Sequence, residues 1–196
     1  MWHCYDLESG SETYFFYTPW NSNSLVLPIG SIQFESRADG YYDFAIIRVD
    51  NEILDPQFVI RNVDADQYKK LIIINDGTIS SHYAYACKSG VITHLTCFDG
   101  VFCEIKKNNN KVVELIITDL YSLLDNASGP VFSFASAENL YSVDVYGIVV
   151  TVGPGICTVQ SLDTILLNFG AELKFLKIFL FMWKVHNSTL HHVIYP

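Results

Sequence analysis

The residues of this chain that are best suited to chemistry are its five cysteines and six histidines. A zinc site needs such ligands at close, paired spacing, and no CxxC pair is present to complete one. The tandem His191-His192 lies in the C-terminal tail, where two adjacent histidines alone do not make a metal site. An odd number of cysteines also does not suit a fully paired secreted scaffold. The sequence therefore predicts no metal and no organic cofactor.

Charge excludes one class of partner. Lys and Arg number 12 against 21 Asp and Glu, which gives a net charge of -9. Nucleic-acid binding needs a surplus of cations that displace counterions from phosphates, so no nucleic-acid partner is expected. The basic cluster of Lys106, Lys107 and Lys111 surrounds three asparagines and is typical of a solvated hairpin tip. No stretch reaches the roughly 18 apolar residues of a spanning helix, so no membrane association is expected.

The elements that must position any site are mostly short strands. Half of the 196 residues are hydrophobic, and Val, Ile, Leu, Phe and Tyr dominate this half, as in β-proteins. Helical spacing occurs in one segment, Ser161–Leu173. Turn residues separate the strands, and Asp99-Gly100, between two apolar runs, predicts a hairpin turn. This pattern indicates an antiparallel barrel or sandwich in one domain, or in two small ones. The expected strands are 13–17, 25–27, 32–35, 42–49, 71–74, 91–97, 101–106, 112–118, 131–134 and 143–152.

Four local patterns, in one order, resemble the chymotrypsin-like serine proteases of the bacterial streptogrisin type. The family's aspartate-bearing strand is similar to Asp43–Val49 (DFAIIRV), and its cysteine-bounded hairpin to Cys87–Cys97 (CKSGVITHLTC). Its nucleophile loop is similar to Asp125–Phe132 (DNASGPVF), and the strand leading to its substrate-binding edge to Tyr146–Val149 (YGIV). Together these patterns cover about residues 40 to 170.

The resemblance implies an all-β fold of two antiparallel β-barrels, the first incomplete, with a C-terminal helix. The expected divisions are a partial barrel at 1–75, a second barrel at 76–170 and an unassigned apolar tail at 171–196. It also implies a disulfide between Cys87 and Cys97. The expected partner is a peptide or protein, bound as substrate or ligand in the cleft between the barrels.

The resemblance assigns the catalytic acid and base to Asp43 and His3. The family places its histidine directly before a disulfide cysteine, as in His3-Cys4, a few tens of residues ahead of the aspartate; here 40 positions separate the two. The strands that should precede this histidine are then absent from the chain, which predicts a first barrel with an open edge. The N-terminus lacks a secretory signal, although the family is secreted, so either a cytosolic protein or a chain that begins partway into a longer ancestor is expected.

The nucleophile loop departs from the family pattern at three positions. Aligned on Gly129-Pro130, the family's Gly-Asp-Ser-Gly becomes Asp125-Asn126-Ala127-Ser128. Alanine has no nucleophile, and Asp125 puts a side chain and a carboxylate where a glycine N–H lines the oxyanion hole. Asn126 replaces the aspartate that anchors the loop. The sequence therefore predicts a serine endopeptidase homologue without peptide-bond hydrolysis.

Two alternatives remain. If one glycine were deleted from the loop, Ser128 would stand at the nucleophile position and the chain would be a working endopeptidase. If His3, Asp43 and residues 127–128 are far apart, the chain is an unrelated β-rich peptide- or protein-binding module. The cysteines favour loss of activity, because the position that should pair with Cys157 is Tyr121. The tail, 171–196, is predicted to be an amphipathic helix, a membrane-surface segment or translated non-coding sequence.

Overall fold

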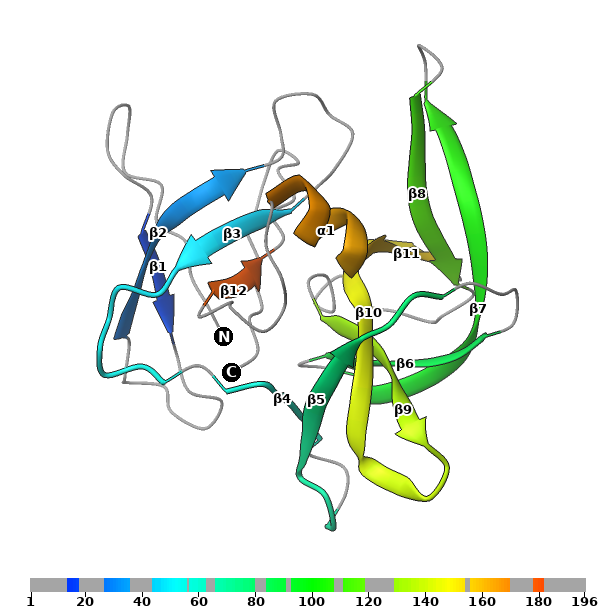
Figure 1. Ribbon diagram of the computed structural model, residues 1–196, viewed down its shortest axis with the longest axis horizontal. Helices are drawn as coiled ribbons and strands as arrows, with labels where there is room; N and C mark the ends of the chain where they lie inside the picture. Colours follow the sequence, from blue (N-terminus) through cyan, green and yellow to red (C-terminus); the bar gives the residue numbers. More distant parts are fainter. Residues whose placement is uncertain are drawn as a thin grey trace.

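The computed structural model describes residues 14–17, 27–35, 44–55, 57–62, 66–79, 84–90, 93–107, 111–118, 129–153, 156–169 and 178–181. Within these ranges the chain is almost entirely β-structure with one short helix (Figure 1). The elements are β1 (Tyr14–Tyr17), β2 (Leu27–Glu35), β3 (Ala45–Arg48), β4 (Val59–Arg61), β5 (Lys70–Asp76), β6 (Ala84–Gly90), β7 (His94–Lys107), β8 (Lys111–Thr118), β9 (Pro130–Ser136), β10 (Asn139–Gly153), β11 (Ile156–Ser161), α1 (Leu162–Phe169) and β12 (Ile178–Phe181).

The N-terminal strands form a four-stranded antiparallel sheet in the order β1-β2-β3-β12. In strand β3, Ile46 and Ile47 on its two faces are both fully buried. Strands β2 and β3 cross closely, because a Cβ on Gly30 would lie 1.9 Å from the Arg48 carbonyl oxygen. Only glycine permits this approach.

The last strand of this sheet comes from the C-terminal tail. Residues Ile178–Phe181 run antiparallel to β3, where Figure 1 shows the orange-red β12 beside the cyan β3. The described sheet remains open, with β1 and β12 at its edges, and the amphipathic helix, one of the alternatives expected for the tail, is wrong at these four residues. The error arose because an apolar run of this length does not distinguish a strand from a helix by periodicity.

The C-terminal strands close into a barrel. The second sheet has the order β11-β8-β7-β6-β9-β10-β5-β4, and an additional β10–β11 pairing joins the ends of its first six strands into a ring. Every pairing around this ring is antiparallel. Closure leaves the ring without a free edge along most of its length.

Strand β7 is long because it pairs with two different strands of the barrel along its length. Its first half pairs with β6 and its second half with β8, and Gly100 pairs with both Ala84 and Thr118. The hairpin turn predicted at Asp99-Gly100 is wrong, since the strand continues through this dipeptide. A glycine at the point where a strand passes between partners lets it bend without ending.

Strands β4 and β5 extend the second sheet beyond the ring. Strand β5 pairs in parallel with the first part of β10, with Ser142 opposite Ile72 and Val143 opposite Ile73. Strand β4 pairs with β5 alone among the described strands. The sequence analysis missed β4, β6 and β11, because short strands beside turn residues give little periodic signal.

Two apolar clusters fill the C-terminal barrel, and α1 covers one of them. The prediction of a helix from Ser161 is confirmed with α1 beginning one residue later, because Ser161 Oγ accepts a hydrogen bond from Thr164 N and caps it. Leu162, Ile165 and Leu166 of the predicted apolar face are buried. The first cluster comprises Ile60, Leu71, Cys87, Phe132, Val143, Val145, Leu162 and Leu166. The second comprises Ile79, Ala86, Phe98, Ile116, Val131, Val149, Cys157 and Val159.

Candidate functional site

The six residues predicted to form or disable the catalytic centre lie outside the described residues. They are His3, Asp43, Asp125, Asn126, Ala127 and Ser128. Their mutual geometry stays a prediction, and the described parts of the site are the strands that flank them. Phe44 follows Asp43 directly, and Gly129 follows Ser128 directly.

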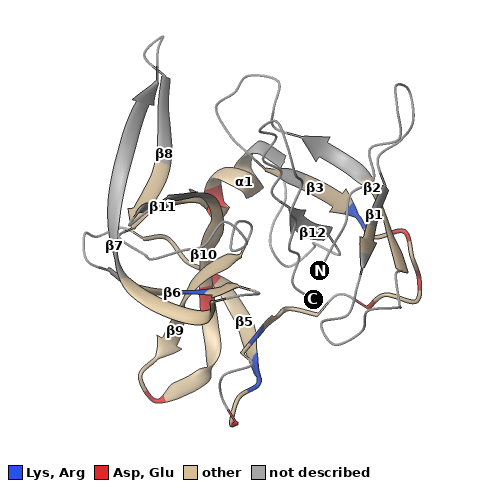
Figure 2. Ribbon diagram, turned by 180° about the vertical axis from the view of Figure 1, so that it is seen from behind, with Lys and Arg blue, Asp and Glu red and all other residues tan. Residues whose placement is uncertain are grey.

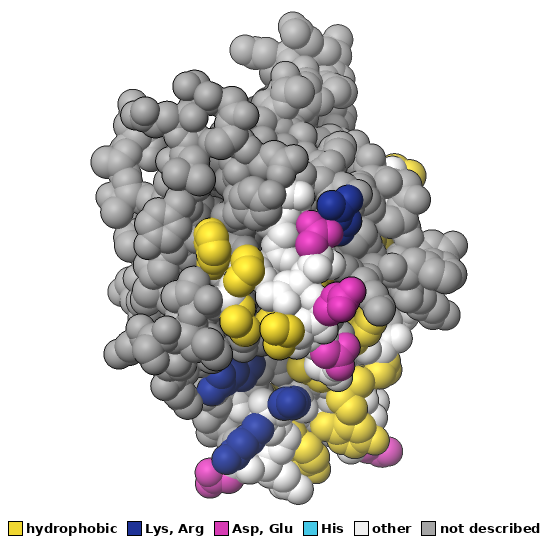
Figure 3. Space-filling view, turned by 90° about the vertical axis from the view of Figure 1, so that its left-hand side faces the viewer, with side chains coloured by type: hydrophobic (Ala, Val, Ile, Leu, Met, Phe, Trp, Pro, Cys, Tyr) yellow, Lys and Arg dark blue, Asp and Glu magenta, His cyan; other side chains and the backbone are white. Residues whose placement is uncertain are grey.

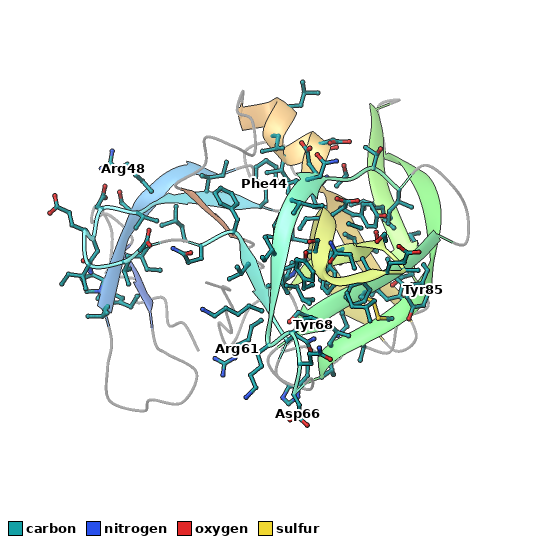
Figure 4. All side chains as sticks on the ribbon, turned by 60° about the horizontal axis from the view of Figure 1, so that its bottom comes forward. Phe44, Arg48, Arg61, Asp66, Tyr68 and Tyr85 are labelled. Carbon is teal, nitrogen blue, oxygen red and sulfur yellow. A yellow bond between two sulfur atoms is a disulfide. The ribbon has the colours of Figure 1, made fainter. Side chains whose placement is uncertain are left out.

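The chain after Asp43 is firmly held. Phe44 is 2% exposed, and β3 begins at the next residue with Ile46 and Ile47 also buried. Figures 1 and 4 show that β3 begins at the end of the sheet nearer the C-terminal barrel, where Phe44 lies, whereas Arg48 lies at the far end. The position after Asp43 is therefore at the side of the N-terminal sheet that faces the second barrel.

The chain after Ser128 is held by both neighbouring strands. Gly129 is buried, and its carbonyl oxygen accepts a hydrogen bond of 2.9 Å from Val149 N of β10. Strand β9 then begins at Pro130 and pairs with β6 through Val131 and Phe132. The end of the predicted nucleophile loop is thus fixed against β10 and β6.

The predicted disulfide lies beside this strand. Cys87 of β6 and Cys97 of β7 are direct cross-strand partners and are joined by a disulfide. Cys87 also stands opposite Phe132 of β9. The prediction made from the cysteine-bounded hairpin is confirmed.

Beyond the Gly129–Val149 hydrogen bond, β9 no longer pairs with its edge of β10. Strand β9 pairs with β10 as far as Ile148, opposite Pro130. After a register shift at Val150, the last residues of β10, from Thr151 to Gly153, pair with β11 and with no other strand that the structure describes. Within the described residues this edge of β10, next to Gly129, has no strand partner, and strand addition takes place at edges of this kind.

A buried lysine lies under the same strands, and sequence reasoning treated it only as part of the hairpin motif. The side chain of Lys88 is fully buried, and its Nζ donates a hydrogen bond of 2.6 Å to Thr93 Oγ1. Lys88 stands opposite Val131 in the β6–β9 pairing. Burial lowers the pKa of Lys88 to about 8, because desolvation disfavours the charged form.

Cys157 is a buried free thiol, in keeping with the loss of its expected partner. It belongs to the second core cluster, and its Thr118 partner in β8 donates from Oγ1 to the Cys157 carbonyl oxygen at 3.5 Å. Burial raises the pKa of this thiol to about 11, and the nearby Lys88 charge opposes the shift. A thiol with so high a pKa is a poor nucleophile at neutral pH.

Ser89, the residue after Lys88, links this hairpin to the strands outside the ring. Ser89 is buried, and its Oγ donates a hydrogen bond of 2.9 Å to the carbonyl oxygen of Arg61 in β4. The Lys88 hydrogen bond therefore stays within the disulfide hairpin, whereas the Ser89 hydrogen bond joins the hairpin to β4.

Surface charges of the two signs cluster in two places, although Arg48 lies among the acidic side chains. Basic side chains gather on β4–β5, where Arg61, Lys69 and Lys70 lie (Figure 2). Acidic side chains gather on the segment after β3, where Asp50, Glu52 and Asp55 are exposed, and Figure 3 shows both groups on one face. Arg48 pairs with Asp50, and its hydrogen bond lowers the pKa of that carboxyl. No broad basic surface appears in the described part of the chain.

The described residues carry neither a cluster of metal ligands nor a membrane-spanning helix. Those residues contain no group of three or more His, Cys, Asp or Glu side chains placed to hold a metal ion. Their single helix is too short to cross a membrane, and no other described segment forms a spanning helix.

The fold is similar to that of two solved proteases. A glutamic acid-specific serine protease, whose substrate binding uses a histidine triad, aligns with a TM-score of 0.56 and 16% identity, over 83% of this chain and 87% of that chain. Cellulomonas bogoriensis chymotrypsin aligns with a TM-score of 0.50 and 16% identity, over 81% and 73%. No protein-family model and no curated protein sequence matches the chain. The protein has a chymotrypsin-like fold, as predicted.

Proposed function

We propose that this protein is a homologue of serine endopeptidases that binds extended peptides without cleaving them. Three features support the proposal: the chymotrypsin-like fold, the sequence of residues 125–128 and the backbone edge at the end of β10. The division into a partial first barrel and the streptogrisin-type origin belong to the same proposal.

The loss of hydrolysis is proposed from the chemistry of the nucleophile loop. Acyl transfer needs a hydroxyl that a histidine deprotonates, and backbone N–H groups that stabilise the oxyanion. In the alignment on Gly129-Pro130, the hydroxyl position is Ala127 and the glycine that supplies an oxyanion N–H is Asp125. A carboxylate at this position opposes the negative charge that must form in the transition state.

The observation that carries the binding function is the edge of β10 beside Gly129. Val149 N is already bonded to the Gly129 carbonyl oxygen, and after a register shift at Val150 the residues Thr151–Gly153 pair with β11 on their other edge. An extended peptide can continue the sheet here by strand addition, with main-chain hydrogen bonds that do not depend on a nucleophile. Binding and cleavage are therefore separable in this fold.

Hydrogen exchange with a peptide probe tests the proposal. The full chain is incubated with a degenerate pool of acetylated, amidated hexapeptides, and exchange is measured by mass spectrometry. We expect added protection at amides 150–153, unchanged exchange at 84–90 in β6, and intact peptides. The Ser128→Ala variant is the matched control and should bind equally, because binding does not involve the Ser128 hydroxyl.

Two results overturn the proposal in different ways. Cleavage of the pool that is lost in Ser128→Ala makes the chain a working endopeptidase. Unchanged exchange at 150–153 with intact peptides rejects peptide binding at β10.

A further inference from the structure

The turn that follows β3 presents an apolar side chain among carboxylates. In this turn, which we call the acidic tip (Asp50–Asp55), Ile53 is 80% exposed, and Glu52 and Asp55 on either side of it are also exposed. Single exposed apolar side chains are ordinary on protein surfaces. The tip can act as a binding element only if the chain holds it in a fixed shape.

Hydrogen bonds fix the acidic tip to the N-terminal sheet. Asn51 Nδ2 donates to the Pro28 carbonyl oxygen at 2.7 Å, and Asn51 Oδ1 accepts a hydrogen bond of 3.0 Å from Ile53 N. The backbone N–H groups of Asp50 and Asn51 both donate to the carbonyl oxygen of Ile29 in β2. Because the turn is already ordered, a partner that covers Ile53 loses little binding free energy to the ordering of the backbone.

Strands β4 and β5 carry the complementary features. Arg61 and Lys70 are cross-strand partners, so their positive side chains share one face of the sheet, and the exposed Lys69 is adjacent in sequence. Alternation along β5 places Ile72 on this face with Lys70. Ile72 is 45% exposed and Ile74 is 54% exposed. We call these five residues the basic–apolar face. Like charges directly opposite one another destabilise a strand pair, and an anion placed on them offsets this effect.

The acidic tip and the basic–apolar face match in charge and lie on one side of the molecule. Among the described residues from 57 to 74, Asp66 is the single acid beside three cations, so the face is positive. The tip is negative, because two carboxylates remain after Arg48 pairs with Asp50. Figure 3 shows the acidic side chains of the tip above the basic side chains of β4–β5. A two-fold axis can therefore bring the tip of each copy onto the face of the other, and such a contact closes with two chains.

We propose that the protein forms a two-fold symmetric dimer in which the acidic tip of each copy docks on the basic–apolar face of the other. The two remaining carboxylates of the tip pair with Lys69 and Lys70, and Ile53 covers the exposed isoleucines of β5. The high exposure of Ile53 in one chain shows that it is not docked on its own copy. This interface does not include residues 150–153 of β10, so the dimer and peptide binding at that edge are tested independently.

Charge reversal tests the dimer in the full chain. Sedimentation velocity should show a dimer whose share grows with protein concentration in the micromolar range. Two variants each reverse one surface: Lys69→Glu with Lys70→Glu, and Glu52→Lys with Asp55→Lys. Each alone should weaken dimerisation at least about tenfold, because like charges then meet at both contacts of the dimer. A mixture of the two variants should form a heterodimer, because one contact keeps its native charges and the other has both signs exchanged.

Matched controls separate this interface from general effects of charge and hydrophobicity. Lys106→Glu with Lys107→Glu, at the end of β7, changes the net charge as much as the first variant and should leave dimerisation unaltered. Ile53→Ser should weaken the dimer at least about tenfold, whereas Leu167→Ser should not, although Leu167 on α1 is 83% exposed. A native chain that stays monomeric, a mixture that forms no heterodimer, or controls that weaken the dimer as much as the test variants would overturn the proposal.

Discussion

The two sheets of this protein differ in how the edges of their strands are covered. The C-terminal strands close a ring with one another, and a disulfide fastens two of them. The N-terminal sheet stays open, and its interior strand β3 depends on β12 from the far end of the chain. The ring is built from residues that follow one another in sequence, whereas the open sheet depends on a distant contact.

This difference predicts unequal stability. Contacts between distant segments cost more loop-closure entropy than contacts between neighbours. We therefore expect the N-terminal sheet to open before the ring does, in the manner of separate cooperative units. The following substitutions are made at matched positions in the two regions.

The largest effect is expected from the buried phenylalanines. Phe132 in the ring is 0% exposed and Phe44 before β3 is 2% exposed. Phe132→Ala should lower the free energy of global unfolding by about 3–5 kcal/mol, because it leaves a cavity in the barrel core. Phe44→Ala should mainly speed exchange in the N-terminal sheet. Urea denaturation with exchange mass spectrometry measures both, and equal global losses would show that the two regions unfold together.

Removal of the disulfide comes next. Closure of a loop with a sequence separation of 10 residues between Cys87 and Cys97 is worth about 3 kcal/mol in the chain-entropy treatment. The double change Cys87→Ala with Cys97→Ala should lower the free energy of unfolding of the ring by this amount, measured by urea denaturation, and leave exchange at 45–48 unaltered. Faster exchange at 45–48 in this variant would mean that the hairpin also supports the first sheet.

Two glycines offer a matched pair with a smaller effect. A Cβ on Gly147 would lie 2.0 Å from the Gln160 carbonyl oxygen, at the β10–β11 seam that closes the ring, and one on Gly30 would lie 1.9 Å from the Arg48 carbonyl oxygen. Backbone must move in both cases, at a cost of about 1–3 kcal/mol. Gly147→Ala should destabilise the ring, and Gly30→Ala only the N-terminal sheet. A thermal melt together with site-resolved exchange distinguishes them.

The smallest effect concerns the pH dependence of the ring. Unfolded lysine keeps its proton to about pH 10.5, whereas Lys88 loses it near pH 8, so the unfolded chain binds more protons between these values. Stability should therefore rise with pH in that window. Cys157 has the opposite effect from about pH 9 to 11, because its unfolded thiol loses its proton first. Denaturation at pH 8 and pH 9 should show the rise in the native protein and not in Lys88→Met.

The parts of this fold that the sequence predicts are those with local signals. The disulfide hairpin follows from the family resemblance of one short motif and α1 from short-range apolar spacing, and both are confirmed. The pairing of β12 with β3 could not be predicted, because a run such as Ile178–Phe181 fits a strand or a helix equally well and its partner is distant in sequence. At Asp99-Gly100 a strong local signal predicted a turn that does not form. Strand β7 continues there because it pairs with β6 on one side and with β8 on the other. The burial of Lys88 also could not be predicted from the sequence, because it depends on the pairing of β6 with β9.

The candidate site was predictable only in outline. The motif order identifies His3, Asp43 and residues 125–128, and these stay predictions. The edge of β10 depends on where β9 ends, at Pro130, and no sequence pattern specifies that endpoint.

The account is tested most directly by labelling with a fluorophosphonate, which reacts only with an activated serine. We predict no labelling of the purified chain, and little after Ala127→Ser alone, because loss of one oxyanion donor costs about 10²–10³ in rate. The combination of Asp125→Gly, Asn126→Asp and Ala127→Ser should restore more than any single change, since such residues act as a unit. Labelling of the unmodified protein that disappears in Ser128→Ala would contradict the account and make Ser128 the nucleophile.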